Sequence, residues 1–156
     1  MEKLKIIGGN KLSGSISCSG AKNAALPMLA ATILTDKVVT FKNLPYLQDI
    51  TTMFEILGSM GADITLNETM DFTISTSNLH DFEARYELVK TMRASILVLG
   101  SLVARHGFAR IALPGGCAIG TRPVDFHLDA LEQLGAKIEL KNGYIEASAK
   151  KLSGCE

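Results

Sequence analysis

A ten-residue pattern that occurs twice constrains the fold of this chain more than any other feature. Residues 57–66 read LGSMGADITL and residues 131–140 read LEQLGAKIEL, with leucine, glycine, alanine, isoleucine and leucine at the same offsets. A glycine after an apolar helical run is typical of a helix end, and the alternation that follows is typical of a strand. Two such units are expected to bury a shared core by stacking against each other.

The residues around this pattern predict two units, each with the order helix, strand, helix, strand, strand. Upstream, residues 23–26 (NAAL) resemble residues 93–96 (RASI), which extends the repeat towards the N-terminus. Helices are expected at residues 23–34, 50–60, 87–104 and 125–134. Strands are expected at residues 4–7, 15–18, 38–41, 62–66, 72–75, 108–113, 136–140 and 144–147. Residues 78–86 are expected to be irregular, and the Asn-Gly pair at 142–143 predicts a type I′ turn.

Single residues define the expected helix ends. Pro27 is expected near the first turn of its helix, where a missing N–H costs little. Asp49 is expected to cap the N-terminus of the second helix. Gly61 and Gly135 are expected to end the helices that precede them.

The second unit differs from the first by a long insertion between its first strand and its second helix. This loop, residues 113–123, reads LPGGCAIGTRP. Its glycines allow a ligand to approach the backbone, and its prolines limit how far the loop can relax. A nearby guanidinium favours the thiolate, so Cys117 could act as a nucleophile or proton donor, and Arg122 suits a phosphate or carboxylate. From residue type alone, a surface turn with an incidental cysteine is an equal alternative.

Composition restricts the partners. The chain has 156 residues, the size of one ordinary domain, and its 16 basic and 16 acidic residues cancel. No global field attracts nucleic acid or an anionic membrane, so neither is expected as a partner. No apolar run is long enough to span a bilayer, and no signal peptide is evident. Three cysteines without metal-ligand spacing favour a reducing cytoplasm over a disulfide framework.

Three motifs in a fixed order suggest a family. Residues 19–27 read SGAKNAALP, residues 90–95 read KTMRAS, and residues 114–125 read PGGCAIGTRPVD. Together they resemble the signatures of the UDP-N-acetylglucosamine enolpyruvyl transferase family, and the resemblance covers nearly the whole chain. It implies an α/β fold, an enolpyruvyl transferase-like inside-out α/β prism built of repeated helix-strand-helix-strand-strand units, which is incomplete here. Family members have two similar domains of three units each, with the active site in the cleft between them.

The resemblance also implies how the chain is divided. Residues 1–21 resemble a segment that belongs to the second domain, and residues 22–156 resemble two of the three units of the first, at about 22–78 and 87–150. We therefore expect an N-terminal fragment that lacks the second domain as its partner. That domain carries the family's general-base aspartate, so the fragment is expected to be inactive alone.

The activity implied by the resemblance is transfer of the enolpyruvyl group from phosphoenolpyruvate to the 3′-hydroxyl of UDP-N-acetylglucosamine, the first committed step of peptidoglycan synthesis. Cys117 is implied as the catalytic thiol and as the target of the antibiotic fosfomycin. The residues implied to bind phosphoenolpyruvate are Lys22, Asn23 and Arg122. Those implied to bind UDP-N-acetylglucosamine are Arg93, Arg122, Pro123, Val124, Asp125 and Phe126. Neither a cofactor nor a metal is implied.

Other interpretations remain open. Taken alone, Lys22 and Arg93 are more often solvated helix residues, and Asp125 could be only an N-cap. A 5-enolpyruvylshikimate-3-phosphate synthase-like enzyme would share the fold and the phosphoenolpyruvate chemistry, although that family lacks a cysteine corresponding to Cys117 and carries Ser-Lys-Ser in place of Ala21-Lys22-Asn23. A non-catalytic fragment that binds a nucleotide sugar is the alternative from another class.

Overall fold

The structure is a computed structural model that describes residues 3–113 and 124–155. A first unit and a second unit follow each other along the chain. The first contains α1 (Lys22–Ala31), the 3-10 turn η1 (Thr32–Leu34), β1 (Val39–Phe41), α2 (Gln48–Ser59), β2 (Asp63–Leu66) and β3 (Phe72–Ser75). The second contains β4 (Glu83–Ala84), α3 (Tyr86–Val89), the 3-10 turn η2 (Arg93–Ile96), α4 (Leu97–His106), β5 (Phe108–Ala112), α5 (Asp125–Gln133), β6 (Lys137–Lys141) and β7 (Tyr144–Ser148).

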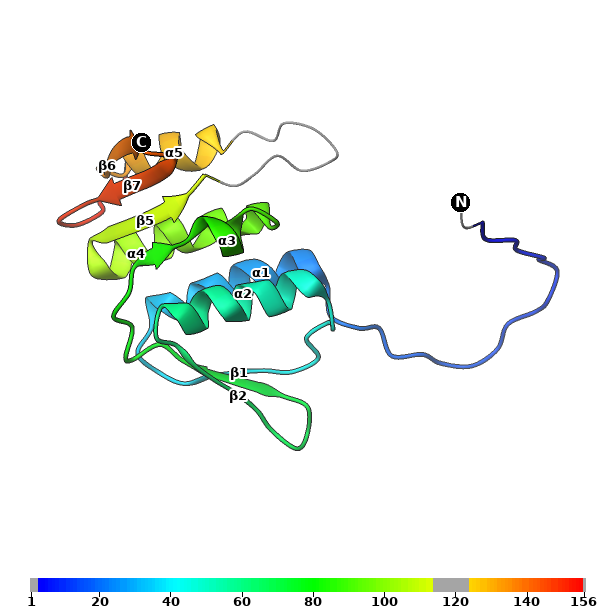
Figure 1. The fold of residues 1–156 in the computed structure, drawn as a ribbon. Coiled ribbons are helices and arrows are strands. Elements are labelled where there is room, and N and C mark those ends of the chain that lie inside the picture. The colour runs from blue at the N-terminus through cyan, green and yellow to red at the C-terminus, as the bar shows by residue number, and fades with distance from the viewer. Residues whose placement is uncertain (1–2, 114–123, 156) are drawn as a thin grey trace.

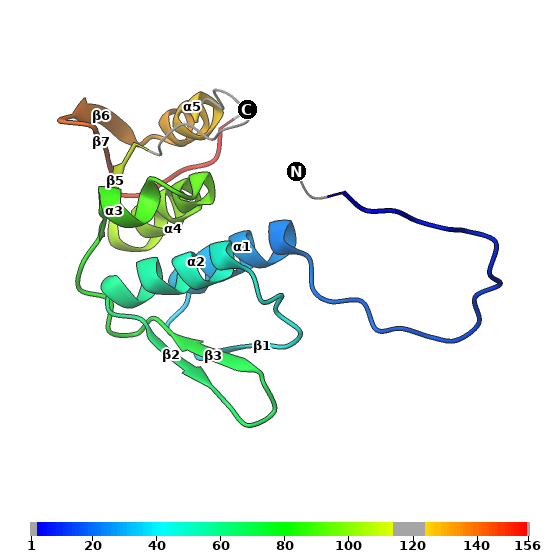
Figure 2. The ribbon, with the colours of Figure 1, turned by 45° about the vertical axis from the view of Figure 1, so that its right-hand side comes forward.

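Helices form the interior of the fold, and the sheets lie outside them. Figures 1 and 2 show α1, α2, α3 and α4 between a sheet of the first unit and a sheet of the second unit. Helix α1 packs against both α2 and α4. Leu29 of α1 and Leu99 and Leu102 of α4 are fully buried. The arrangement confirms the predicted inside-out α/β class.

The two sheets share a three-stranded topology, to which the second sheet adds β4. The first has the strand order β1-β3-β2, and the second has the order β4-β5-β7-β6. In the first unit β1 and β2 pair antiparallel with β3, which lies between them, and in the second unit β5 and β6 pair in the same way with β7. Helix α2 lies between β1 and β2 in the chain, and helix α5 lies between β5 and β6. The repeat predicted from the sequence is therefore present in the order of the elements and in the pairing of the strands.

The way in which α2 and α5 end explains why leucine, glycine and alanine recur in the repeat. In α2 the N–H of Gly61 donates to the carbonyl of Gly58, and the N–H of Ala62 donates to that of Leu57, both at 3.0 Å. These two bonds make a Schellman motif, which needs a positive φ at the glycine. The same two bonds end α5, at 2.9 Å each, from Gly135 to Glu132 and from Ala136 to Leu131. Gly61 has a φ of 103° and Gly135 a φ of 96°.

The N-terminal segment differs from its prediction. No β-strand forms at residues 4–7 or 15–18. The segment has no regular structure and extends away from the helices (Figure 1). Its apolar side chains are exposed, with Leu4 at 97% and Ile16 at 91%. A β-strand needs a neighbour that accepts and donates its backbone hydrogen bonds. The part of the chain that the structure describes offers this segment none.

The helix predicted at residues 87–104 is interrupted. Helix α3 ends at Val89, and α4 begins at Leu97 after the turn η2. Between them Met92 is extended, with φ −137° and ψ 103°, and its carbonyl accepts hydrogen bonds from both the N–H and the hydroxyl of Ser95. Ser95 is fully buried, so its hydroxyl needs a hydrogen-bond partner. In a continuous helix the Met92 carbonyl would instead accept a hydrogen bond from the N–H four residues later.

Three smaller predictions were also wrong. Asp49 is not the N-cap of α2, because the helix begins at Gln48 and Leu47 takes the cap position without a side-chain bond. Pro27 is the sixth residue of α1, beyond its first turn, because that helix begins at Lys22. The region expected to be irregular contains β4, which pairs parallel with β5. A two-residue strand carries no periodicity by which sequence could detect it. In contrast, the predicted type I′ turn is supported by positive φ at residues 142 and 143.

Candidate functional site

The predicted substrate-binding residues come from elements that begin on the same side of the molecule. In Figure 1, α1, α2 and α5 all start on the right-hand side, where β5 also ends. Helix N-termini carry unpaired N–H groups and the positive end of the helix dipole, so this edge favours anions. Cys117, Arg122 and Pro123 lie outside the described residues.

Lys22 and Asn23 are the first two residues of α1. The Nζ of Lys22 lies 2.7 Å from Oδ2 of Asp49, in the first turn of α2. The Lys22 side chain is 44% exposed and that of Asp49 is 33% exposed, so the ion pair remains accessible to a solute. Asn23 is exposed. Because Pro27 has no N–H, it cannot donate to the Asn23 carbonyl four residues earlier, which leaves that carbonyl without its usual helical donor.

Arg93 lies on a separate element. It is the first residue of η2, directly after the extended Met92, and it is half-buried. The break between α3 and α4 therefore decides where Arg93 sits, since a continuous helix over residues 87–104 would have rotated it to another position.

The segment that follows the loop carries three predicted residues. Val124 takes the N-cap position of α5 and is 8% exposed, and its carbonyl accepts hydrogen bonds from the N–H groups of His127 and Leu128. Asp125 is the first helical residue and is exposed, so it is not the N-cap that was considered as an alternative. Phe126 is 81% exposed, which is unusual for a large aromatic side chain.

One residue of this edge was missed by sequence reasoning. Asp49 was expected only as a helix cap, yet its carboxylate pairs with Lys22, which the sequence had singled out. The two positions are far apart in the chain and belong to different helices. No local pattern reports such a pair, because only the packing of α1 beside α2 brings the side chains together.

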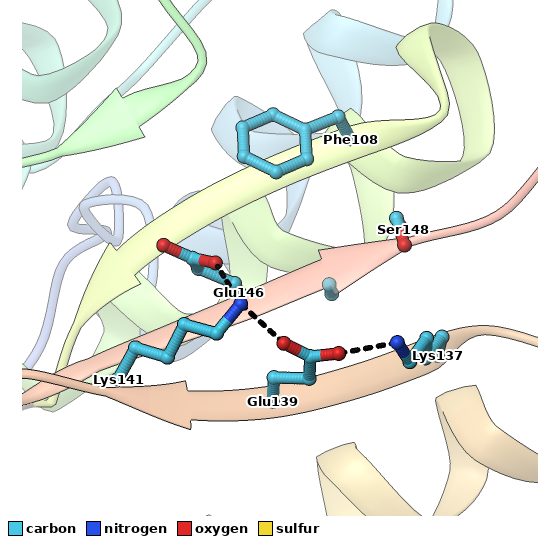
Figure 3. A pocket seen from close by; sticks show the side chains of 7 residues that line it. Phe108, Lys137, Glu139, Lys141, Glu146 and Ser148 are labelled. Atoms are coloured by element: carbon cyan, nitrogen blue, oxygen red, sulfur yellow. Dashed lines mark ion pairs between the residues drawn. The ribbon is translucent and has the colours of Figure 1, made fainter.

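A hollow of about 250 Å³ lies elsewhere, on the outer face of the second sheet (Figure 3). Lys141 pairs there with Glu139 and, at 3.4 Å, with Glu146, and Lys137 also pairs with Glu139. Hydrogen bonds from the two lysines lower the pKa of Glu139 to about 2. The two lysines and two glutamates of this hollow balance each other's charge.

The row of charges continues across the sheet beyond the hollow. Arg110 pairs with Glu146 at 3.2 Å and with Glu83 at 2.6 Å, and its guanidinium lies 3.8 Å from the ring centre of Tyr144. Hydrogen bonding to Glu83 raises the pKa of Arg110 further. Alternating charges on neighbouring strands stabilise the solvent face of a sheet, and we assign this row that structural role.

Within residues 3–113 and 124–155, no group of three His, Cys, Asp or Glu side chains is placed to hold a metal ion. No helix in this described part has the length and apolar character needed to cross a membrane.

Comparison with known proteins identifies related sequences over nearly the whole chain. Residues 6–155 match the family model described as EPSP synthase (3-phosphoshikimate 1-carboxyvinyltransferase). The UDP-N-acetylglucosamine 1-carboxyvinyltransferase of Halorhodospira halophila is 56% identical over 154 residues, which are 99% of this chain and 37% of that protein. The protein of the same name from Coxiella burnetii is 56% identical over 157 residues, covering 100% of this chain and 36% of its own length.

Solved structures agree on the fold. The enolpyruvyl transferase NikO from Streptomyces tendae aligns with a TM-score of 0.76 at 27% identity, over 95% of this chain and 32% of that chain. The EPSP synthase of Acinetobacter baumannii aligns with a TM-score of 0.67 at 17% identity, over 90% of this chain and 33% of that chain, and shows the fold alone. The chain spans little more than a third of the length of the curated relatives it matches. It belongs to the EPSP synthase (3-phosphoshikimate 1-carboxyvinyltransferase) family, and over its whole length it is similar to UDP-N-acetylglucosamine 1-carboxyvinyltransferases.

Proposed function

We propose that this chain is part of an enzyme that transfers the enolpyruvyl group of phosphoenolpyruvate to the 3′-hydroxyl of UDP-N-acetylglucosamine and releases phosphate. The observation that carries the proposal is the 56% identity to proteins of that name over 99% of the chain. The reaction opens peptidoglycan synthesis, which supplies the cell wall for growth and division, and its nucleotide-sugar substrate places it in the cytoplasm.

Roles for the site residues follow from the motifs. Cys117 is proposed to donate a proton to phosphoenolpyruvate, and Lys22, Asn23 and Arg122 to bind that substrate. The proposed ligands of UDP-N-acetylglucosamine are Arg93, Arg122, Pro123, Val124, Asp125 and Phe126. Both substrates are anions, and the position of Lys22 at the N-terminus of α1 supports an anion site on this edge. The exposed ring of Phe126 offers a flat apolar surface beside it.

The remaining two thirds of the relatives' length are needed for turnover in this proposal. By resemblance, that part supplies the opposite wall of the cleft and the carboxylate that takes the proton of the 3′-hydroxyl. A general base must lie within hydrogen-bond reach of the proton that it removes. No carboxylate of this chain lies in a motif that assigns it that role.

The test measures phosphate release from phosphoenolpyruvate and UDP-N-acetylglucosamine by two proteins. One is the 156-residue chain alone, and the other is this chain fused to the remaining part of the Halorhodospira halophila relative. We expect turnover only from the fusion, and its loss on Cys117→Ser. A fusion that folds and binds UDP-N-acetylglucosamine without releasing phosphate would contradict the proposal in favour of a binding role.

A second acceptor substrate distinguishes the proposal from its nearest alternative, a 5-enolpyruvylshikimate-3-phosphate synthase-like enzyme. That alternative is the activity named in the description of the family model. The same fusion is offered shikimate 3-phosphate in place of UDP-N-acetylglucosamine. We expect no phosphate release with it, because the Cys117 loop and Ala21-Lys22-Asn23 both differ from the pattern of that enzyme. Turnover with shikimate 3-phosphate alone would assign the chain to the alternative.

A further inference from the structure

One connection holds the chain at the point where α1 begins. Between β1 and α2, Asn43 has a φ of 56°, in the left-handed region that a non-glycine residue rarely adopts. Its Nδ2 donates a hydrogen bond of 3.2 Å to the carbonyl of Cys18. Its own carbonyl lies so close to Gly20 that a Cβ added there would be 2.2 Å from the oxygen. The preceding segment is exposed, so this contact is where the N-terminal chain becomes attached to the fold.

The helix that follows this connection carries the residue that pairs with Lys22. Asp49 lies in the first turn of α2 and places Oδ2 2.7 Å from Nζ of Lys22. The backbone before Lys22 and the tip of its side chain are thus both fixed by residues 43–49.

Charge explains why Lys22 needs such a partner. An ammonium at the first residue of a helix is repelled by the positive end of the helix dipole, and α1 has no acidic residue in its own first turn. A free lysine side chain also populates many rotamers, and ordering it costs conformational entropy. Asp49 offsets both effects, and its position in the first turn of α2 is itself favourable for a carboxylate.

We propose that Asp49 is a positioning residue for Lys22, and that Gly20 and Asn43 fix the backbone from which Lys22 extends. The inference rests on the proposed function, in which Lys22 binds the phosphate of phosphoenolpyruvate. A lysine ammonium has three N–H donors. The contact with Asp49 occupies one of them, and the others stay available to the phosphate because the pair is partly exposed.

Trace acetylation of the 156-residue chain tests the contact, with the rate at each lysine read by mass spectrometry. We expect Asp49→Asn to raise the rate at Lys22 by about two- to fivefold, the range that a half-exposed ion pair allows. Asp49→Glu should restore a rate near that of the wild type. Asp36→Asn, which removes an exposed carboxylate beyond the other end of α1, should leave it unchanged. Unchanged rates at Lys90 and Lys141 show that each variant is folded.

Phosphoenolpyruvate is then added to the fusion with the remaining part of the relative, which supplies the opposite wall of the cleft, and the acetylation of Lys22 is measured again to test the role in binding. We expect it to protect Lys22 in the wild type, and we expect Asp49→Asn to need a higher concentration for half-protection. Equal or better protection of Asp49→Asn, or an unchanged acetylation rate without ligand, would overturn the positioning role. If phosphoenolpyruvate fails to protect Lys22 in the wild type, the phosphate-binding role of Lys22 in the proposed function fails, and the present inference fails with it.

Discussion

Cys117 is the residue on which most of the proposed chemistry depends. The sequence places it in a glycine-rich loop five residues before Arg122, and a guanidinium nearby favours the thiolate. We therefore predict that Cys117 reacts faster with iodoacetamide than Cys18 and Cys155, although both of these are exposed. Mass mapping after brief alkylation measures the three rates in one sample. Preferential labelling of Cys18 or Cys155 would refute the prediction, and by resemblance fosfomycin should also modify Cys117 in a complete enzyme.

Arg105 joins the two units at the opposite ends of the helices. Its Nη1 donates to the carbonyls of Ile33 at 2.8 Å and Thr35 at 2.7 Å, and to Oγ1 of Thr76 at 3.0 Å. Arg105→Met keeps much of the aliphatic stem but leaves these acceptors without their charged donor. We expect the free energy of unfolding to fall by about 1.5–3 kcal/mol, measured by urea denaturation.

Arg85→Met is the matched control for that measurement. Arg85 is 71% exposed and its contact with Asp81 is 3.6 Å long, so its loss should change stability by less than about 0.5 kcal/mol. Equal effects of the two substitutions would show that the Arg105 contacts do not stabilise the joint between the units.

His106 is expected to make stability depend on pH. Its ring stacks on Phe82 at 4.5 Å between centroids, and burial, followed by the charge of Arg105, lowers its pKa. A histidine with a lowered pKa in the folded state stabilises fully above its ordinary value of about 6.5, and this contribution is lost as pH falls towards the folded-state pKa. We predict that His106→Phe, which keeps a stacking ring but does not titrate, loses less stability than the wild type between neutral and mildly acidic pH. An identical pH profile of the free energy of unfolding would contradict this.

At the scale of elements, the two Schellman motifs offer a matched pair of glycines. Gly61 and Gly135 both have positive φ, so alanine at either position is strained by about 1 kcal/mol or more. At Gly61 a Cβ would also lie 2.4 Å from the His80 ring and 2.8 Å from the Asn78 carbonyl, whereas at Gly135 the nearest atom is 3.9 Å away. Gly61→Ala should therefore cost about 1–3 kcal/mol more than Gly135→Ala in thermal or urea unfolding. Equal losses would show that residues 78–80 move aside freely.

The elements that sequence predicted well are those whose signals are local. A glycine that must adopt positive φ specifies a helix end by itself, so the ends of α2 and α5 were placed correctly. The pairing of Asp49 with Lys22 depends on packing between distant segments, and no local window of sequence contains both partners. The N-terminal segment has the alternation of a strand but lacks a neighbour within the described chain. For the site, motifs named the candidate residues, while only the structure showed which helix starts face the same side.

At the scale of the whole molecule, the distribution of apolar residues around α1 indicates which of its faces should be covered. After Asn23, every residue of α1 is apolar. One face is buried through Ala25, Leu26, Leu29 and Ala30, but the other stays at the surface. A helix that is apolar all round is normally buried on every side. In the fold family this chain belongs to, we expect another part of a longer protein to cover that second face.

The second face of α1 therefore predicts how the 156-residue chain behaves alone. Met28 is 49% exposed and Leu34, just beyond the helix, is 54% exposed, and Pro27 and Ala31 of α1 are exposed as well. Such an apolar patch favours self-association, because contact with a second copy removes apolar area from water. We expect sedimentation velocity to show association that increases with concentration, and Met28→Lys to weaken it without changing the far-ultraviolet circular dichroism. Glu55→Lys on α2 introduces a lysine on an exposed side chain away from this patch, and it should leave association unchanged. A chain that stays monomeric at all concentrations, or a Met28→Lys variant that associates as the wild type does, would show that this face needs no cover.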